Sequence, residues 1–188
     1  MTQDKNPALL VVDDEGEILY SLRRLLRKEY DFHAAPSGYE GLKVLERTPI
    51  QVVLADQRMP EMTGVDFLAQ VRARYPETTR LLLTGYSDLP AVIEAINRGH
   101  VFAYITKPWD PDGLRLLLRQ ACERHDQLAE RRRLLTDVSA YLGRCLDQMK
   151  GLRDANPGAF DELAQAGAAL RGRVEQALAP KPESLAGP

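Results

Sequence analysis

Acidic, hydroxyl and basic side chains stand at the ends of several short apolar runs. Asp13 and Asp14 follow one run, Asp56 and Thr84 close two others, and Lys107 follows a fourth. Three carboxylates brought together would repel one another unless a cation lay among them, and oxygen ligands without His or Cys favour a hard ion such as Mg²⁺. A lysine and a hydroxyl group suit phosphoryl oxygen atoms. The set predicts an aspartate that accepts a phosphoryl group with the help of a metal ion.

These side chains meet only if the apolar runs are neighbouring strands. Runs of this kind occur at 8–12, 52–55, 81–84 and 101–106 and are typical of strands buried on both faces, and a weaker run at 32–35 is expected nearer an edge of the sheet. Helical spacing of apolar residues occurs between and after them, at 17–28, 39–46, 65–75, 90–97 and from 114 onward. Five strand–helix repeats predict an α/β fold with a doubly wound, five-stranded parallel sheet. Sites in such sheets lie at the carboxyl ends of the strands.

Three motifs that carry Asp13, Asp14, Asp56 and Lys107 match a known family in order and spacing. They are Val-Val-Asp-Asp-Glu at 11–15, Asp-Gln-Arg-Met-Pro-Glu-Met-Thr-Gly at 56–64 and Tyr-Ile-Thr-Lys-Pro-Trp at 104–109. Over about residues 7–124 the sequence resembles the receiver domain of two-component response regulators, which has a flavodoxin-like fold. The resemblance implies that a sensor histidine kinase phosphorylates Asp56.

The resemblance also implies roles for the other residues of the site. Mg²⁺ would be bound by Asp13, Asp14 and Asp56, with the carbonyl oxygen of Arg58 as a further ligand. Thr84 and Lys107 would engage the phosphoryl group, Thr84 and Tyr104 would form the conformational switch, and the Lys107–Pro108 peptide bond would be cis. Arg58 and Tyr86, two residues after Asp56 and Thr84, would modulate the access of water to the site.

Several of these residues have simpler interpretations. Asp13 or Asp14 alone would serve as a helix N-cap, and Gly64 as a turn residue. Tyr104 would be a packing residue of its strand. Arg58 would either pair with the phosphoryl group or shield it, or else point to solvent, and the sequence does not choose between these roles.

The chain after residue 122 contains no strand pattern. From Leu114 to Leu152 apolar residues recur in steps of three and four, which predicts a coiled coil or a long bundle helix. Asn156-Pro-Gly158 interrupts the pattern, which resumes from Phe160 to Ala177. We therefore expect a receiver domain at 1–124, a helical coiled-coil or hairpin extension at 125–178 that continues the fifth receiver helix, and a disordered tail or linker at 179–188.

The apolar stripe of the extension predicts a homodimer. Its seam would consist of Leu128, Leu135, Val138, Leu142, Met149 and Leu152. The competing interpretation is an intramolecular hairpin in which Phe160, Leu163, Leu170 and Val174 fold back onto the same stripe. Both arrangements together would make a four-helix bundle.

Composition narrows the functional classes. The 188 residues include 25 basic and 27 acidic residues, a formal net charge of −2, and residues 123–178 carry nine of each, so nucleic-acid binding is not expected. The chain has no run of about 18 apolar residues and no signal-peptide pattern at its start, which predicts a cytoplasmic protein. Cys122 and Cys145 are too far apart in the sequence to form a redox or metal motif.

The leading interpretation is a signalling switch whose helical extension acts on a downstream protein target. The alternative is the receiver and linker of a longer regulator with an enzymatic output domain, such as a kinase or a cyclic-dinucleotide enzyme. A haloacid-dehalogenase-like phosphatase also uses an aspartate nucleophile and Mg²⁺, but it needs a second aspartate two residues after the first. That position is Arg58 in this sequence, so this class is not expected. No independent enzyme activity is expected beyond self-catalysed phosphorylation and dephosphorylation of Asp56.

Overall fold

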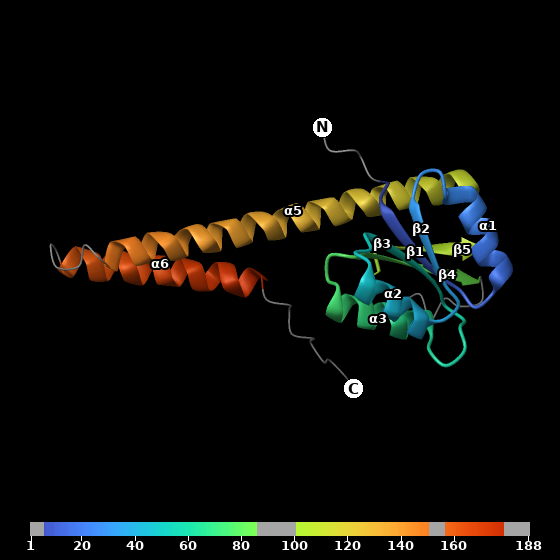
Figure 1. Ribbon diagram of the computed structural model, residues 1–188, viewed down its shortest axis with the longest axis horizontal. Coiled ribbons are helices and arrows are strands. Elements are labelled where there is room, and N and C mark those ends of the chain that lie inside the picture. Colours follow the sequence, from blue (N-terminus) through green and yellow to red (C-terminus); the bar gives the residue numbers. More distant parts are fainter. Residues whose placement is uncertain (1–5, 86–100, 151–156, 179–188) are drawn as a thin grey trace. The chain divides into compact units, whose positions relative to one another are not determined.

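Five parallel strands form one sheet, as the sequence predicts (Figure 1). They are β1 (Ala8–Val12), β2 (Asp31–Ala35), β3 (Val52–Asp56), β4 (Thr79–Gly85) and β5 (Ala103–Lys107), in the spatial order β2-β1-β3-β4-β5. The step from β2 back past β1 to β3 is the topological switch of a doubly wound sheet. The predicted fold class is therefore confirmed.

The computed structural model describes residues 6–85, 101–150 and 157–178. Within these ranges the helices are α1 (Gly16–Leu26), α2 (Gly38–Arg47), α3 (Gly64–Arg74), α5 (Pro111–Lys150) and α6 (Pro157–Leu178). The predicted helix at 90–97, Tyr86, Leu152 and the predicted tail at 179–188 lie outside the described residues. The chain divides into two units after Gln127, and α5 contributes to both.

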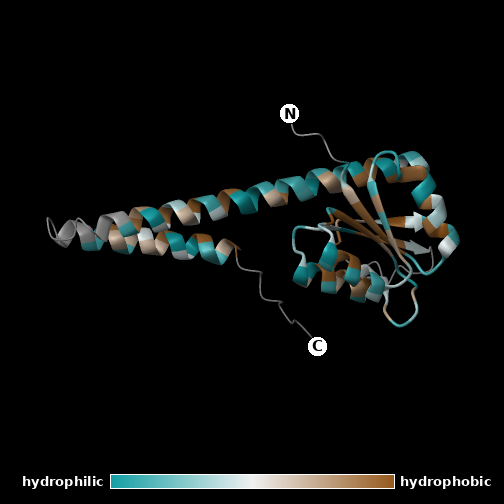
Figure 2. Ribbon diagram, in the orientation of Figure 1, coloured by the Kyte–Doolittle hydropathy of each residue, from teal (hydrophilic) through white to brown (hydrophobic). Residues whose placement is uncertain are grey.

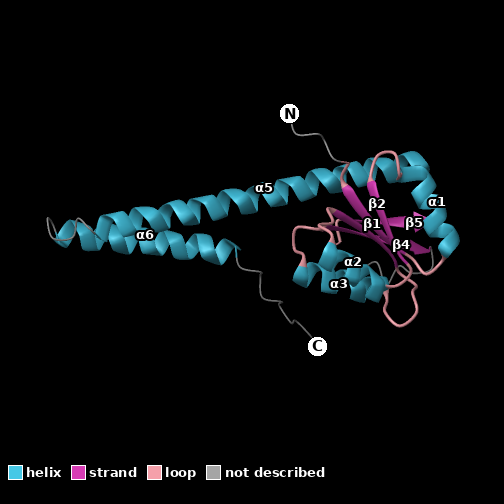
Figure 3. Ribbon diagram, in the orientation of Figure 1, coloured by secondary structure: helices cyan, strands magenta, loops and turns pink. Residues whose placement is uncertain are grey.

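Helices cover both faces of the sheet in the first unit (Figure 3). Side chains of β1 alternate between two apolar clusters, with Leu10 and Val12 in the cluster under α2 and α3 and Leu9 and Val11 in the cluster under α1 and α5. This explains the largely apolar character of the strands (Figure 2), because a strand covered on both faces consists mostly of apolar residues.

Local sequence signals start the helices that border the site. The hydroxyl oxygen atoms of Ser37 and Thr63 accept hydrogen bonds from the backbone N–H groups of Glu40 and Asp66, which caps α2 and α3. At the start of α5 the Asp110 carboxylate accepts a hydrogen bond from the N–H of Gly113 at 2.7 Å. These caps hold the ends of the helices at the edge of the sheet where the strands finish.

The register of the strands aligns their carboxyl ends. Val12 of β1 is level with Ala55 of β3, so Asp13 and Asp56 follow at the same height. Gly85 of β4 is level with Lys107 of β5. The predicted site residues on these four strands therefore lie at one edge of the sheet.

The second unit contains an antiparallel pair of helices formed by the end of α5 and by α6 (Figure 1). A β-carbon on Gly167 would lie 2.7 Å from Cδ2 of Leu146, and one on Gly143 would lie 3.6 Å from a guanidinium nitrogen of Arg171. Val174 is buried. Gly167 thus allows close approach of the two helices, and α6 runs back along the end of α5.

The hairpin divides the predicted apolar stripe. Leu128, Leu135 and Leu142 of the predicted seam are half-buried, Val138 is exposed, and the side chain of Met149 is outside the described set. On α6, Leu163 and Leu170 remain 59% and 43% exposed, in contrast to the expectation that they pack onto α5. At Gly167 α6 approaches Leu146 of α5, and the two leucines on either side of this point keep more than a third of their surface exposed. No helix in the described part of the chain is long and apolar enough to span a membrane.

Candidate functional site

The ammonium group of Lys107 lies between two buried carboxylates at the carboxyl edge of the sheet. Its Nζ atom is 2.7 Å from Oδ1 of Asp56 and 3.0 Å from Oδ2 of Asp13. The side chains of Asp13 and Asp56 are 0% and 6% exposed, whereas that of Lys107 is 21% exposed. The end of β5 thus supplies the cation that holds the ends of β1 and β3 together.

Burial and ion pairing have opposite effects on the pKa of Asp13, and likewise on the pKa of Lys107. Burial raises the pKa of the Asp13 carboxyl above its usual value, although the N–H of Glu15 and the ammonium of Lys107 counteract part of this. Burial alone would lower the pKa of Lys107, but the hydrogen bonds and charges of Asp56 and Asp13 outweigh it and raise that pKa. Lys107 therefore stays charged, and the site concentrates negative charge around one cation.

Backbone contacts hold Asp56 in place. Its Oδ2 atom accepts a hydrogen bond from the N–H of Arg58 at 2.7 Å. The N–H of Gln57 donates to the carbonyl of Leu83, and the carbonyl of Gln57 accepts from the N–H of Gly64 at 3.1 Å. The loop after β3 thus closes against the start of α3, and Asp56 turns one carboxylate oxygen toward Lys107.

Thr84 and Tyr104 occupy two different environments. Thr84 is buried near the end of β4, and its hydroxyl donates a long hydrogen bond of 3.4 Å to the carbonyl of Gly85. Tyr104 lies on β5 with 44% of its surface exposed. The Lys107–Pro108 peptide bond is cis. The sheet therefore places Thr84 on the strand next to that of Asp56 and Tyr104 on the following strand, β5.

The predicted metal ligands are only partly assembled. Asp14 and Arg58 are both exposed, although Arg58 is not without an interaction partner. Among the described residues, no three Asp, Glu, His or Cys side chains already converge as a set of metal ligands. The donor chemistry nevertheless suits Mg²⁺, since Asp13 and Asp56 already share one cation and Asp14 adds an oxygen donor at the end of the same strand.

Two residues that support the site were not predicted as site residues. The carboxylate of Glu15 lies 3.4 Å from Nζ of Lys107, and its position directly after the Asp13-Asp14 pair was the available sequence signal. The side-chain Oε1 of Gln57 accepts a hydrogen bond from the N–H of Val65 at 3.2 Å, which ties the loop after β3 to α3. Nothing in the sequence pattern marks this second contact, because it depends on the path of the loop.

Comparisons with known proteins agree with this geometry. The family model described as response regulator receiver domain matches residues 9–119, which is more than half of the chain. A relative is the hydrogenase transcriptional regulatory protein HoxA of Cupriavidus necator, which is 44% identical over 120 residues, 64% of this chain and 25% of that protein. The chain thus spans about a quarter of the length of this curated relative.

Solved structures show the same fold. The signal receiver domain of an HD domain-containing protein from Pseudomonas fluorescens Pf-5 is 38% identical, with a TM-score of 0.67, and the match covers 70% of this chain and 97% of that one. An adenylate cyclase from Rhodopirellula baltica is 30% identical, also with a TM-score of 0.67, and the match covers 70% of this chain and 98% of that one. From the family match, these relatives and the carboxylates around Lys107, we conclude that the chain belongs to the response regulator receiver family of two-component signalling.

Proposed function

We propose that the chain is a phosphorylation-dependent switch in which Asp56 accepts the phosphoryl group of a sensor histidine kinase. The observation that carries this proposal is the position of the Lys107 ammonium between the buried carboxylates of Asp13 and Asp56. Receiver domains of this family are phosphorylated by sensor histidine kinases. In the transfer, a carboxylate oxygen of Asp56 forms a bond to phosphorus while the bond from phosphorus to the kinase imidazole breaks.

The residues around Asp56 are suited to charge compensation. Asp13, Asp14 and Asp56 would hold Mg²⁺, with the carbonyl of Arg58 as a further ligand, and the ion would neutralise charge on the phosphoryl oxygen atoms. Lys107 keeps its positive charge because its carboxylate partners raise its pKa. Lys107 would pair with one phosphoryl oxygen. The hydroxyl of Thr84 would give up its long hydrogen bond to the carbonyl of Gly85 and donate a hydrogen bond to another phosphoryl oxygen.

Phosphorylation by a small donor tests the acceptor directly. With acetyl phosphate and Mg²⁺, mass spectrometry should show one phosphoryl adduct on the full chain, and chelation of the metal should abolish it. Asp56→Asn keeps the shape of the side chain but removes the nucleophile, so the adduct should disappear. An undiminished adduct on this variant would overturn the assignment of Asp56.

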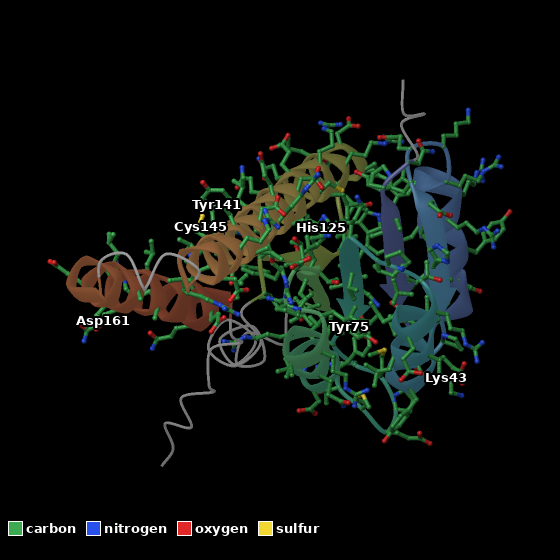
Figure 4. All side chains as sticks on the ribbon, turned by 60° about the vertical axis from the view of Figure 1, so that its left-hand side comes forward. Lys43, Tyr75, His125, Tyr141, Cys145 and Asp161 are labelled. Carbon is green, nitrogen blue, oxygen red and sulfur yellow. The ribbon has the colours of Figure 1, made fainter. Side chains whose placement is uncertain are left out.

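We further propose that the helical extension makes the protein a homodimer and transmits the signal to a downstream protein target. Of the seam predicted from the sequence, Leu128, Leu135 and Leu142 are half-buried and Val138 is 44% exposed. Leu134 and Tyr141, which lie beside Val138 on α5, are 59% and 61% exposed. These three positions lie on one stripe of the helix. Tyr141 projects from α5 close to Cys145 (Figure 4).

The exposed residues of α6 continue this surface. Leu163 and Leu170 also share a stripe, and an ideal helical wheel places both stripes on the same side of the α5–α6 contact. We name Leu134, Val138, Tyr141, Leu163 and Leu170 the hairpin face. A second copy packing its hairpin face against the first would form a four-helix bundle, a common solution for two apolar helical faces.

The alternative proposal is that the chain is part of a longer regulator with another output domain. It is supported by the titles of the two structural matches, which describe a receiver domain of an HD domain-containing protein and an adenylate cyclase, and by the short share of the relative that the chain covers. The full reading frame of the gene distinguishes the two. An enzymatic domain encoded after residue 188 would favour this alternative.

A further inference from the structure

The ammonium of Lys107 has a third carboxylate partner outside the expected site. Besides Asp13 and Asp56, it contacts Oε1 of Glu15 at 3.4 Å. An ammonium group has three N–H donors, so these three carboxylates match its full capacity. The side chain of Glu15 is 64% exposed, in contrast to the buried side chains of its two neighbours.

The position of Glu15 on α1 gives a second, independent observation. Glu15 is the N-cap residue of α1, but its side chain makes no capping hydrogen bond to that helix. Its backbone N–H instead donates to Oδ1 of Asp13 at 2.8 Å. Glu15 therefore fixes Asp13 through its backbone and Lys107 through its carboxylate, and its side chain serves the site rather than the helix.

We propose that Glu15 is a positioning residue that gives Lys107 an alternative acceptor when a divalent cation takes the carboxylates of Asp13 and Asp56. This inference rests on the proposed function of the site. A cation that binds Asp13 and Asp56 competes with Lys107 for the same oxygen atoms, so Lys107 needs another partner. The negative charge of Glu15 also attracts the cation. Both effects of Glu15 increase the affinity for Mg²⁺ without a direct metal contact.

The test is a titration of the full chain with Mg²⁺ in the absence of any phosphodonor. Binding is followed by calorimetry and by the fluorescence of Trp109, the single tryptophan, which lies two residues after Lys107 and packs against the core cluster under α1 and α5. Glu15→Gln should raise the Kd for Mg²⁺ roughly two- to fivefold, the range expected for an exposed ion pair. The melting temperature of the metal-free protein should stay close to that of the wild type.

Glu17→Gln is the matched control, because Glu17 is exposed in the first turn of the same helix and is not a partner of Lys107 in the described structure. It should leave the Kd for Mg²⁺ unchanged. The rate of phosphorylation by acetyl phosphate at saturating Mg²⁺ should remain within about twofold of the wild type in Glu15→Gln, since the acceptor and Lys107 are intact.

Three results separate failure of this inference from failure of the proposed function. If the wild type binds Mg²⁺ and Glu15→Gln has the same Kd as Glu17→Gln, Glu15 has no positioning role. A phosphorylation rate at saturating Mg²⁺ that falls more than about tenfold in Glu15→Gln would also refute the inference, because Glu15 would then act on the chemistry itself. If the wild type does not bind Mg²⁺, the proposed function of the site is wrong.

Discussion

The α-carbon of Gly64, the first residue of α3, lies directly against the backbone carbonyl of Asp56, the last residue of β3. A β-carbon at position 64 would overlap the carbonyl oxygen of Asp56 and would lie 2.9 Å from its carbonyl carbon. These atoms of Asp56 belong to the backbone, so they cannot move aside by a change of side-chain rotamer. The place of the proposed phosphoacceptor in the sheet therefore depends on the absence of a side chain eight residues later.

Gly64→Ala should displace the backbone of Asp56 and disturb the loop that follows it. We expect a loss of about 1–3 kcal/mol in the free energy of unfolding, as for overpacked core positions, together with slower phosphorylation by acetyl phosphate. Gly16→Ala is the control, since a β-carbon there meets no atom within 4 Å. Equal stability and equal phosphorylation rates in the two variants would contradict the steric argument.

Lys107→Ala should destabilise the receiver unit, because it leaves two buried carboxylates next to each other without their cation. The expected loss is about 1.5–3 kcal/mol in urea unfolding at neutral pH without Mg²⁺. Adding Asp13→Asn should restore much of it by removing one of the two charges. Lys43→Ala, which breaks an exposed ion pair with Glu40, should change stability little. A loss in Lys107→Ala that Asp13→Asn does not relieve would show that the charges are not its cause.

Asp13→Asn by itself should stabilise the metal-free protein near pH 7. The pKa of Asp13 is raised in the folded state, mainly by burial, so folding favours its protonated form. Its contribution to stability is fully present below the unfolded pKa and is lost as the pH rises through the raised folded pKa. The variant should therefore melt a few degrees higher than the wild type at pH 7, and this difference should vanish as the pH falls toward 4. A lower melting temperature at pH 7 would contradict the assigned cause.

The hairpin face should carry the dimer contact. Light scattering should show a dimer of the full chain at micromolar concentration, and Tyr141→Asp with Leu170→Asp should convert it to a monomer of unchanged helical content. Tyr20→Asp changes an exposed aromatic residue on α1 and should leave the dimer intact. Leu135→Asp with Leu142→Asp should instead reduce the helical content, because these half-buried residues lie on the part of α5 that pairs with α6. A monomeric wild type would exclude the dimer.

The order of the elements could be predicted because strands buried on both faces leave a simple pattern. Apolar runs such as Val52–Ala55 alternate with amphipathic segments, and parallel strands must end at one edge of the sheet. This geometry made Asp13, Asp56, Thr84 and Lys107 candidates for one site before any contact was known. The structure describes these residues at that edge, and Lys107 contacts both Asp13 and Asp56.

The helical extension shows where periodicity is insufficient. Apolar residues in steps of three and four predict that one face of a helix is buried. The same spacing is expected whether a partner chain or a folded-back helix of the same chain covers that face. The small size of Gly167 against Leu146 lets α6 approach α5 closely, and of the predicted stripe Leu135 and Leu142 are half-buried whereas Val138 stays exposed. The choice depends on the path of the chain through the turn before α6.

The sequence by itself determined the fold class, the family and the candidate acceptor, since these depend on residue type and on spacing along the chain. Tertiary structure alone decided which charges share the ammonium of Lys107, why position 64 has no side chain, and which leucines of the extension remain exposed. The physical reason is that each of these features depends on distances that the folded backbone sets, as between Gly64 and Asp56 or between Glu15 and Lys107. Such distances arise only when the sheet and the helices have packed, and no local pattern records them.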